Sequence, residues 1–138
     1  MVAWTGWTFA NYGSAGPSNP ITEWKRTKLS IQQRADLNYL LGVLRNQREW
    51  SERDFRPRLK GYEGISEIKL KSEDVQIRLV GCFKPGFRYV FLIGCTHKGS
   101  VYDPHRCLDT ADRRKREIDR GEVDLSEHSV SDDEESSQ

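Results

Sequence analysis

Hydrophobic and polar residues alternate along three stretches of the chain, a pattern typical of strands that are buried on one face. The stretches are Ile65–Leu70, Val75–Val80 and Phe87–Cys95. The turn signal Lys84-Pro85-Gly86 separates the second stretch from the third. Because sequential short strands usually pair as neighbours, the pattern predicts an antiparallel meander.

The same alternation assigns charged side chains to a face of this meander. Arg78 lies between the apolar residues Ile77 and Leu79, and Lys69 has the same place in the preceding stretch. If the apolar side chains face the rest of the domain, the two cations project together from an open face. A face of this kind suits a phosphate backbone.

Two helices are predicted ahead of the meander. Asn19 supplies an N-cap and Pro20 the first helical position, so one helix begins there and runs through Trp24. Ser30 caps a second helix from Ile31 to about Asn46, and its leucines have the i, i+3, i+4, i+7 spacing of a buried stripe. We expect the two helices to pack as a hairpin on one face of the sheet.

The flanking segments complete an expected α+β fold, a helical hairpin packed on a small twisted antiparallel sheet. The aromatic segment Trp4–Tyr12 is predicted to form an extended first strand. Asp103-Pro104 marks the start of a short C-terminal helix that ends near Ile118, with Ala111 as its small inward residue.

Charge divides the chain into two parts. Residues 121–138 hold seven acidic residues and no Lys or Arg, which leaves residues 1–120 with 22 basic and 14 acidic side chains, a net charge of +8. Residues 1–120 are therefore predicted to be one cationic domain that favours polyanionic partners. Residues 121–138 are predicted to be a disordered acidic tail that aids solubility, with a second hypothesis that the tail folds onto the basic face and competes with RNA.

Composition excludes several classes of protein. No apolar run approaches the roughly 18 residues needed to cross a membrane, and the N-terminus lacks the basic start and apolar block of a signal peptide. The three cysteines have no metal-ligand spacing, so we expect reduced thiols in the cytoplasm, and Cys82 and Cys95 as packing residues. Neither a metal nor a cofactor is predicted.

A series of short segments carries a resemblance that covers residues 20–117. In order they are Trp24 with Leu29-Ser30, Arg34-Ala35-Asp36-Leu37, Leu59–Ile68, Ile77-Arg78-Leu79, His97-Lys98, and Pro104 followed by Ala111 and Arg114. Their order and spacing resemble the RelE/HigB superfamily of type II toxin–antitoxin toxins, especially its phage-related HigB-like branch. That branch generally carries a Lys-Lys pair followed by a further lysine after the last strand, where this chain has His97–Tyr102, so the positive charge is thinner here.

The resemblance implies a helical hairpin on an antiparallel sheet and cleavage of mRNA, usually on the translating ribosome. It also implies a cognate antitoxin as partner. Metal-independent RNA cleavage uses the 2′-hydroxyl to attack the adjacent phosphate, giving a 2′,3′-cyclic phosphate and a 5′-hydroxyl end. The reaction needs a base, an acid and cations that stabilise the charged phosphoryl group.

Five residues are the candidates for this chemistry. Histidine is the side-chain type whose unperturbed pKa, about 6.5, suits both proton roles, which makes His97 a candidate. Arg78 can hold a phosphate through two hydrogen bonds. Lys69 and Lys98 are candidates for stabilising developing charge or for acting as the base. Tyr102 is a candidate for stacking on a base or assisting proton transfer.

Each assignment has a structural alternative. His97 beside a strand end is equally typical of a solvated surface residue, and Arg78 has Glu67 as an alternative ion-pair partner across the sheet. Tyr102 has packing against the last helix as its alternative.

Three arginines near the C-terminal helix are candidates for contacting the RNA backbone, or else belong to a solvated helix face: Arg106, Arg113 and Arg114. His105 and His128 are interpreted as surface residues.

The competing functions come from other classes of protein. One is a non-catalytic relative that binds a host protein, as ParE toxins bind DNA gyrase, and the other is a phage or mobile-element factor that only binds RNA or a host factor. The sequence predicts no oligomeric state, codon preference or antitoxin identity.

Overall fold

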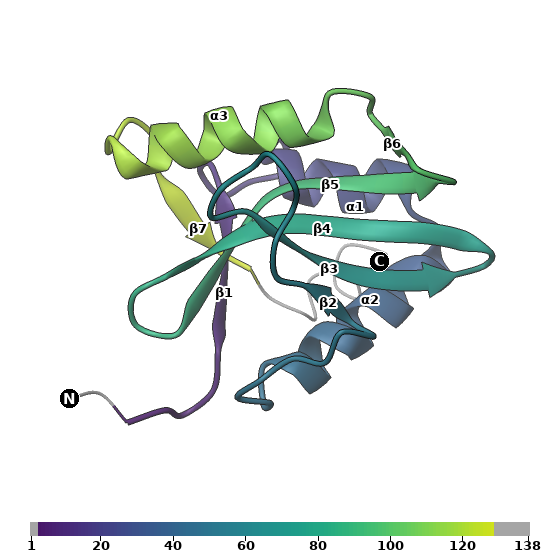
Figure 1. The fold of residues 1–138 in the computed structure, drawn as a ribbon, viewed down its shortest axis with the longest axis horizontal. Helices are drawn as coiled ribbons and strands as arrows, with labels where there is room; N and C mark the ends of the chain where they lie inside the picture. Colours follow the sequence, from purple (N-terminus) through teal and green to yellow (C-terminus); the bar gives the residue numbers. More distant parts are fainter. Residues whose placement is uncertain (1–2, 129–138) are drawn as a thin grey trace.

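A seven-stranded sheet is the centre of the computed structural model, which describes residues 3–128 (Figure 1). Three helices pack against this sheet, so the fold is α+β as predicted. In chain order the elements are β1 (Thr8–Tyr12), α1 (Pro20–Lys28), α2 (Ile31–Leu44), β2 (Phe55–Arg56), β3 (Ser66–Ser72), β4 (Val75–Lys84), β5 (Arg88–Lys98), β6 (Val101–Asp103), α3 (Cys107–Asp119) and β7 (Leu125–Glu127).

The predicted meander is confirmed. β3 pairs antiparallel with β4 and β4 with β5, and β6 returns antiparallel along the end of β5. In this register Lys69 lies opposite Arg78, and Gln76 lies opposite His97. The alternation of the sequence therefore does place Lys69 and Arg78 on one face of neighbouring strands.

The sheet is larger than the predicted small antiparallel sheet, and it is mixed. Its order is β2-β3-β4-β5-β1-β7, with β6 also on β5, and β1 runs parallel to β5. The pairing of Phe9 with Tyr89 joins residues 80 positions apart in the chain. A parallel neighbour needs a crossover connection, and the helical hairpin of α1 and α2 lies between these two strands in the chain.

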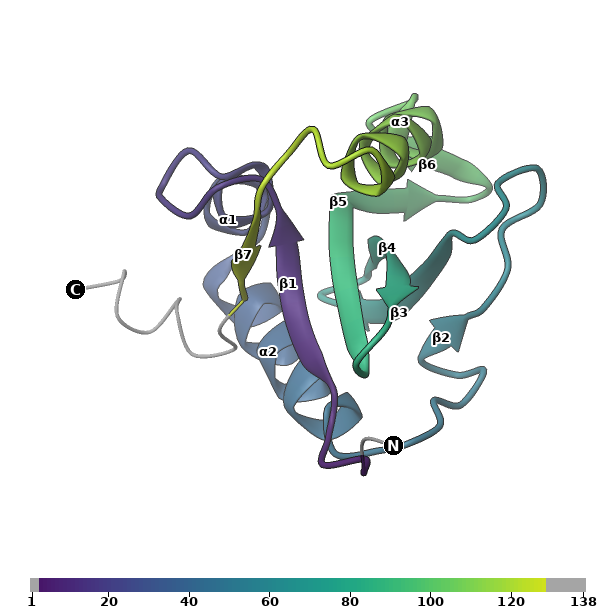
Figure 2. The same cartoon turned by 90° about the vertical axis from the view of Figure 1, so that its left-hand side faces the viewer.

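The two predicted helix caps are present. The side chain of Asn19 accepts hydrogen bonds from the backbone N–H groups of Ile21 and Thr22. Ser30 and Gln33 form a reciprocal capping box, with bonds of 3.1 Å and 2.8 Å. Figure 2 shows α1 and α2 together on one side of the sheet, where the buried leucines of α2 pack against apolar side chains of β3, β4 and β5.

The opposite face of the sheet is covered in part, although the sequence predicted it to be open. α3 lies there (Figure 2), with Ala111 buried as predicted. It packs with Leu59 and Ile65 of the connecting segment over Val80 and Val90. The helix begins at Cys107, three residues after Pro104, where the sequence placed its start. On the same face, Lys69, Gln76 and His97 are partly exposed, and they lie toward the β3–β4 turn.

The acidic segment after residue 120 is part of the fold as far as His128. β7 pairs antiparallel with β1, and the N–H group of His128 donates to the carbonyl oxygen of Phe9 at 3.0 Å. The prediction of disorder is therefore wrong for residues 121–128. The backbone supplies these hydrogen bonds whatever the composition, while Glu122 and Glu127 keep their carboxylates exposed. The rest of the predicted tail, residues 129–138, lies outside the described residues.

His128 is buried, and its interpretation as a surface residue is wrong. Its Nδ1 lies 2.9 Å from Oδ1 of Asn11, and its Nε2 lies 3.3 Å from Nζ of Lys25. Its ring also packs edge-on against Phe91. Burial and the neighbouring ammonium of Lys25 lower the pKa of His128 to about 3.

We expect His128 to make folding stability fall as the pH falls from 7 to 5. Below an unfolded pKa of about 6.5 the unfolded chain binds a proton that the folded chain excludes, which lowers the free energy of unfolding by at most about 1.4 kcal/mol per pH unit. His128→Gln should flatten this slope in urea titrations across that range, whereas His105→Gln, at an exposed position, should keep it. An equal slope in His128→Gln and the wild type would contradict the assignment.

Two glycines are expected to respond to alanine in opposite directions. A Cβ at Gly94 of β5 would lie 2.1 Å from the Trp24 ring, whereas a Cβ at Gly42 of α2 would meet nothing within 4 Å. Gly94→Ala should cost about 1–3 kcal/mol by overpacking, and Gly42→Ala should gain up to about 1 kcal/mol in helix propensity. Urea unfolding of the two variants measures both, and equal shifts would contradict the close approach of Trp24 to β5.

Candidate functional site

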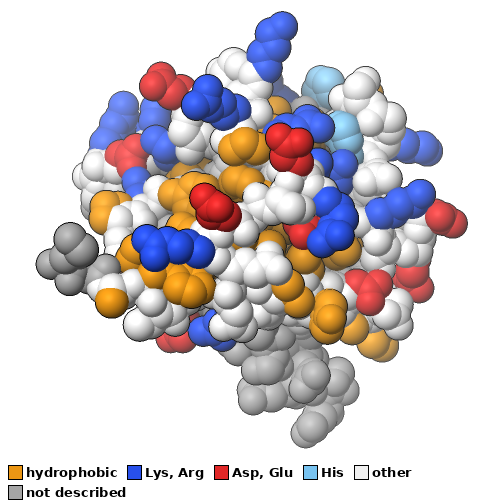
Figure 3. All heavy atoms as spheres, turned by 60° about the horizontal axis from the view of Figure 1, so that its bottom comes forward, with side chains coloured by type: hydrophobic (Ala, Val, Ile, Leu, Met, Phe, Trp, Pro, Cys, Tyr) orange, Lys and Arg blue, Asp and Glu red, His pale blue; other side chains and the backbone are white. Residues whose placement is uncertain are grey.

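The accessible part of the sheet opposite the helical hairpin carries a cluster that we term the cationic face. Its side chains lie in two rows across neighbouring strands, because opposed residues of paired strands share a face. One row is Lys69 and Arg78, and the other is Lys71, Gln76, His97 and Tyr102. Figure 3 shows Lys and Arg side chains gathered beside histidine side chains on this side of the molecule.

Arg78 is on the predicted face, but it is buried rather than projecting. Only 8% of the residue is exposed, because the side chain lies against its own strand. Its guanidinium donates to the carbonyl oxygen of Ile77 at 3.0 Å and to Oε1 of Gln76 at 3.4 Å. These bonds fix the orientation of the guanidinium and leave its Nε without a hydrogen-bond partner among the described residues.

Glu67 is the buried anion of the site. Its side chain is 0% exposed, and Oε2 lies 3.7 Å from Nε of Arg78 and 3.7 Å from Nε of Arg56. These distances give ion pairs that are too long for hydrogen bonds, and Oε2 has no such bond to any described residue. The alternative of an ion pair between Arg78 and Glu67 is therefore confirmed. Nε of Arg78 and Oε2 of Glu67 are both buried, so the guanidinium of Arg78 is accessible only where it lines the hollow described below.

Tyr102 is held by the same carboxylate. Its hydroxyl donates to Oε1 of Glu67 at 2.8 Å. Its ring packs against the apolar cluster that includes Cys107 and Ala111 of α3, in agreement with the structural alternative. Burial, followed by the hydrogen bond to Glu67, raises the pKa of Tyr102 above its ordinary value. The hydroxyl is therefore a hydrogen-bond donor at neutral pH, and the ring lies 4.6 Å from that of His97.

His97 is half-buried on β5, two residues beyond the partner of Arg78. Arg78 pairs with Cys95, so His97 is its diagonal neighbour, a relation that separates backbone positions by about 7–8 Å and lets long side chains meet. The ring contact with Tyr102 restricts the imidazole on its other side. The structure thus brings together four of the five predicted catalytic residues: Lys69, Arg78, His97 and Tyr102.

Lys98 is separated from this group. It is exposed at the end of β5 and pairs with Val101 across the β5–β6 hairpin. Because side chains alternate along a strand, Lys98 lies on the α1 side with Gly94 and Thr96, while His97 lies on the cationic face. Its predicted place beside Arg78 is therefore wrong.

A hollow of about 300 Å³ opens beside Arg78 at the β3 edge of the sheet. Four cationic residues and one carboxylate take part in its lining, along with Gln76 and two leucines. The charged members are Arg53, Lys69, Lys71, Arg78 and Asp54. Arg53 has a partner in Asp54, at 3.4 Å, so the remaining balance of charge in the hollow is positive.

Lys71 of the hollow and Arg56 beside Glu67 were not predicted from the sequence. Lys71 follows Lys69 by two residues, so strand alternation alone could have placed it on the same face. Arg56 belongs to β2, a two-residue strand with no hydrophobic pattern of its own, and only its pairing with Glu67 brings it to the site. Gln76, which orients Arg78, has the same alternation signal as Lys71.

The three predicted RNA-contacting arginines do not act as one surface. Arg106 is exposed and lies 3.5 Å from the Asp109 carboxylate, and Arg113 is exposed on α3. Arg114 is instead half-buried, where it donates to the carbonyl oxygen of Leu92 at 2.7 Å and lies over the ring of Tyr12. Its contacts tie α3 to β5 and β1.

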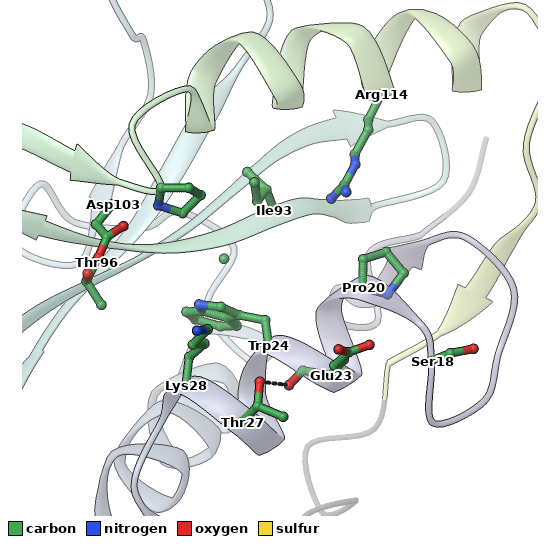
Figure 4. A pocket seen from close by; sticks show the side chains of 12 residues that line it. Ser18, Pro20, Glu23, Trp24, Thr27, Lys28, Ile93, Thr96, Asp103 and Arg114 are labelled. Atoms are coloured by element: carbon green, nitrogen blue, oxygen red, sulfur yellow. Dashed lines mark hydrogen bonds between the residues drawn. The ribbon is translucent and has the colours of Figure 1, made fainter.

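A larger cavity, of about 570 Å³, lies on the other side of β5 between α1 and α3 (Figure 4). The ring of Trp24 forms its centre, with Lys28 and Arg114 as cations and Glu23 and Asp103 as carboxylates. This balanced charge set is less suited to a polyanion than the hollow beside Arg78. No predicted catalytic side chain appears among the described residues that line it.

The three cysteines are buried packing residues. Cys82 and Cys95 are buried and free, as predicted, and Cys107 joins them in the layer beneath α3. Burial raises the pKa of Cys82 to about 11, so this thiol is not a ready nucleophile. Within residues 3–128, no group of three or more metal-ligating side chains is found, and no helix there is long and apolar enough to cross a membrane.

Comparisons of the chain with protein-family models, with curated proteins and with solved structures found no match.

Proposed function

We propose that this chain is the toxin of a type II toxin–antitoxin system and acts as a metal-independent endoribonuclease on mRNA. Its substrate is mRNA on translating ribosomes in the cytoplasm, and a cognate antitoxin protein neutralises it. The observation that carries the proposal is the cationic face, where Arg78 lies beside Lys69, His97 and a cationic hollow.

The chain order supports a RelE/HigB-like arrangement. A first strand leads into two helices, which lead into an antiparallel meander, and the helices cover one face of the sheet. This order leaves the polar residues of the meander on the opposite face. The element order is shared by many folds, so the weight of the proposal rests on the residues of the face.

The reaction assigns one task to each group on this face. Arg78 and Lys69 bind the scissile phosphate and stabilise the negative charge that grows on it during attack by the 2′-hydroxyl. His97 exchanges the proton of the attacking or the leaving oxygen. Glu67 positions the site, because it holds Arg78, Arg56 and Tyr102 in place from a buried position.

A protein-binding function is the second candidate, as in the gyrase-binding relatives. The observation in its favour is on α2, where Ile31 and Tyr39 are 74% and 77% exposed. They lie eight residues apart in the helix and so share one face of it. Large apolar side chains on one exposed helix face are typical of a protein contact.

Induced expression followed by mapping of RNA ends separates the two candidates. We expect transcripts cut with 5′-hydroxyl and 2′,3′-cyclic phosphate ends, and loss of the cuts in His97→Ala. Ile31→Ala with Tyr39→Ala serves as the control, because these residues lie outside the cationic face and should leave the cuts unchanged. Intact RNA together with blocked DNA replication would contradict the nuclease and favour the protein-binding function.

A further inference from the structure

Aromatic side chains line a third concave surface, a groove of about 370 Å³ at the end of the β4–β5 hairpin. Trp7 and Phe83 lie at its centre with ring centroids 5.1 Å apart, and Trp50 lies 5.3 Å and 5.5 Å from them. Phe83 is 44% exposed. We term this surface the aromatic groove, and its lining consists of Trp7, Trp50, Phe55, Pro57 and Phe83, with Arg48, Glu49 and Glu52 at the rim.

The rings of the groove are fixed in place. The indole N–H of Trp7 donates to the carbonyl oxygen of Gln47 at 2.9 Å, and that of Trp50 donates to the carbonyl oxygen of Leu44 at 2.9 Å. Phe83 also packs against the buried ring of Tyr89 at 4.8 Å. A rigid platform of half-exposed rings loses little conformational entropy when a planar group stacks on it.

One segment of chain connects the aromatic groove to the hollow beside Arg78. Arg48 and Trp50 line the groove, Arg53 lines the hollow, and Arg56 reaches Glu67 of the cationic face. In Figure 3 hydrophobic side chains lie beside Lys and Arg side chains on the same face of the molecule. The guanidinium of Arg48 lies 5.7 Å from the Phe87 ring and is exposed to solvent.

Rings interleaved with arginines are the arrangement that single-stranded nucleic acid requires. Bases stack on aromatic faces whatever their sequence, and cations follow the phosphates between them. Residues 48–56 hold three arginines and three carboxylates, and Arg53 pairs with Asp54 while Arg56 pairs with Glu67. Arg48 is therefore the cation of the segment that stands opposite Glu49 and Glu52 at the rim. The segment joins the rings to the cationic hollow beside Arg78, and this continuity favours a nucleic acid over a peptide.

We propose that the aromatic groove is a stacking site for unpaired bases of the RNA whose phosphate lies on the cationic face. The inference rests on the proposed nuclease function, and it adds an RNA-binding site that is separate from the residues that cleave. A longer single strand contacts both the groove and the cationic face, and it gains affinity whatever its base sequence. A short oligonucleotide contacts the cationic face without the groove.

Binding of 2′-O-methyl oligouridylate tests the proposal, because the blocked 2′-hydroxyl prevents cleavage. The probes are a strand of about ten nucleotides, within the range that such grooves cover, and a strand of three. Phe83→Leu keeps apolar volume without a π face, and should weaken the long strand about ten-fold, as expected for loss of one stacked base. Phe83→Tyr should bind the long strand as the wild type does, and the short strand should bind all three proteins equally.

The long strand should also quench tryptophan fluorescence, because Trp7 and Trp50 line the groove, and the short strand should not. Equal binding of the long strand by Phe83→Leu and the wild type would overturn the groove, as would a wild type that does not bind it. If Phe83→Leu weakens binding while Arg78→Ala has no effect on either strand, the groove stands and the proposed cleavage site falls. If Arg78→Ala abolishes cleavage while Phe83→Leu leaves binding of the long strand unchanged, the proposed cleavage site stands and the groove falls.

Discussion

Arg78→Ala is expected to slow RNA cleavage by a factor of about 10² to 10³, the usual effect of removing one preorganised donor from a charged transition state. The guanidinium lies in place before substrate arrives, held by the Ile77 carbonyl and Gln76. Its buried position strengthens its interaction with a phosphate, because little water screens it. The rate of cleavage of a fluorogenic RNA by purified protein measures the effect.

Two further variants separate the charge of Arg78 from its geometry. Arg78→Lys keeps one positive charge without the two parallel donors, so it should retain part of the rate. Arg26→Ala removes an exposed arginine from α1, on the opposite face, and should cleave like the wild type. Arg78→Ala within about three-fold of the wild type would exclude Arg78 from the reaction, since far larger losses follow removal of such donors.

Local signals in the sequence were sufficient for most of the elements. Caps at Asn19 and Ser30 fixed the starts of two helices, and period-two alternation identified the strands of the meander. Both depend on residues close together in the chain. The parallel pairing of β1 with β5 depends on residues about 80 positions apart, and β7 depends on the free edge of β1, so no local pattern could reveal them.

The sequence predicted which face of the sheet carries the site, but not the contacts among the site residues. Alternation placed Lys69 and Arg78 on one face correctly, and the same rule applied to β5 separates His97 from Lys98. Lys98 follows His97 directly in the chain, and neighbours in a strand point to opposite faces of the sheet. The burial of Arg78 goes with its hydrogen bonds to Ile77 and Gln76 and its contact with the buried Glu67, which period-two alternation does not reveal.

Glu67→Ala is expected to lower the free energy of unfolding by about 3 kcal/mol, because it leaves a buried guanidinium without its carboxylate. Arg78 has only about a tenth of its side chain exposed, and the substitution also removes the acceptor of the Tyr102 hydroxyl. Urea unfolding measures the change. Glu63→Ala, at an exposed position four residues earlier, is the matched control and should leave the stability nearly unchanged.

Combining Glu67→Leu with Arg78→Met is expected to restore about 2 kcal/mol of the stability that Glu67→Ala loses, since the pair is then replaced by apolar groups of similar volume. Arg56, half-exposed, can turn to water when its partner is lost. If the double variant loses less stability than the sum of its two single variants, Glu67 and Arg78 act on stability as a pair.

The double variant should fold and still fail to cleave RNA. This result would separate the structural role of the buried pair from the role of Arg78 as a phosphate ligand. A double variant that is as unstable as the sum of its single variants would show instead that the two charges contribute independently, and the long 3.7 Å contact would then have no energetic role.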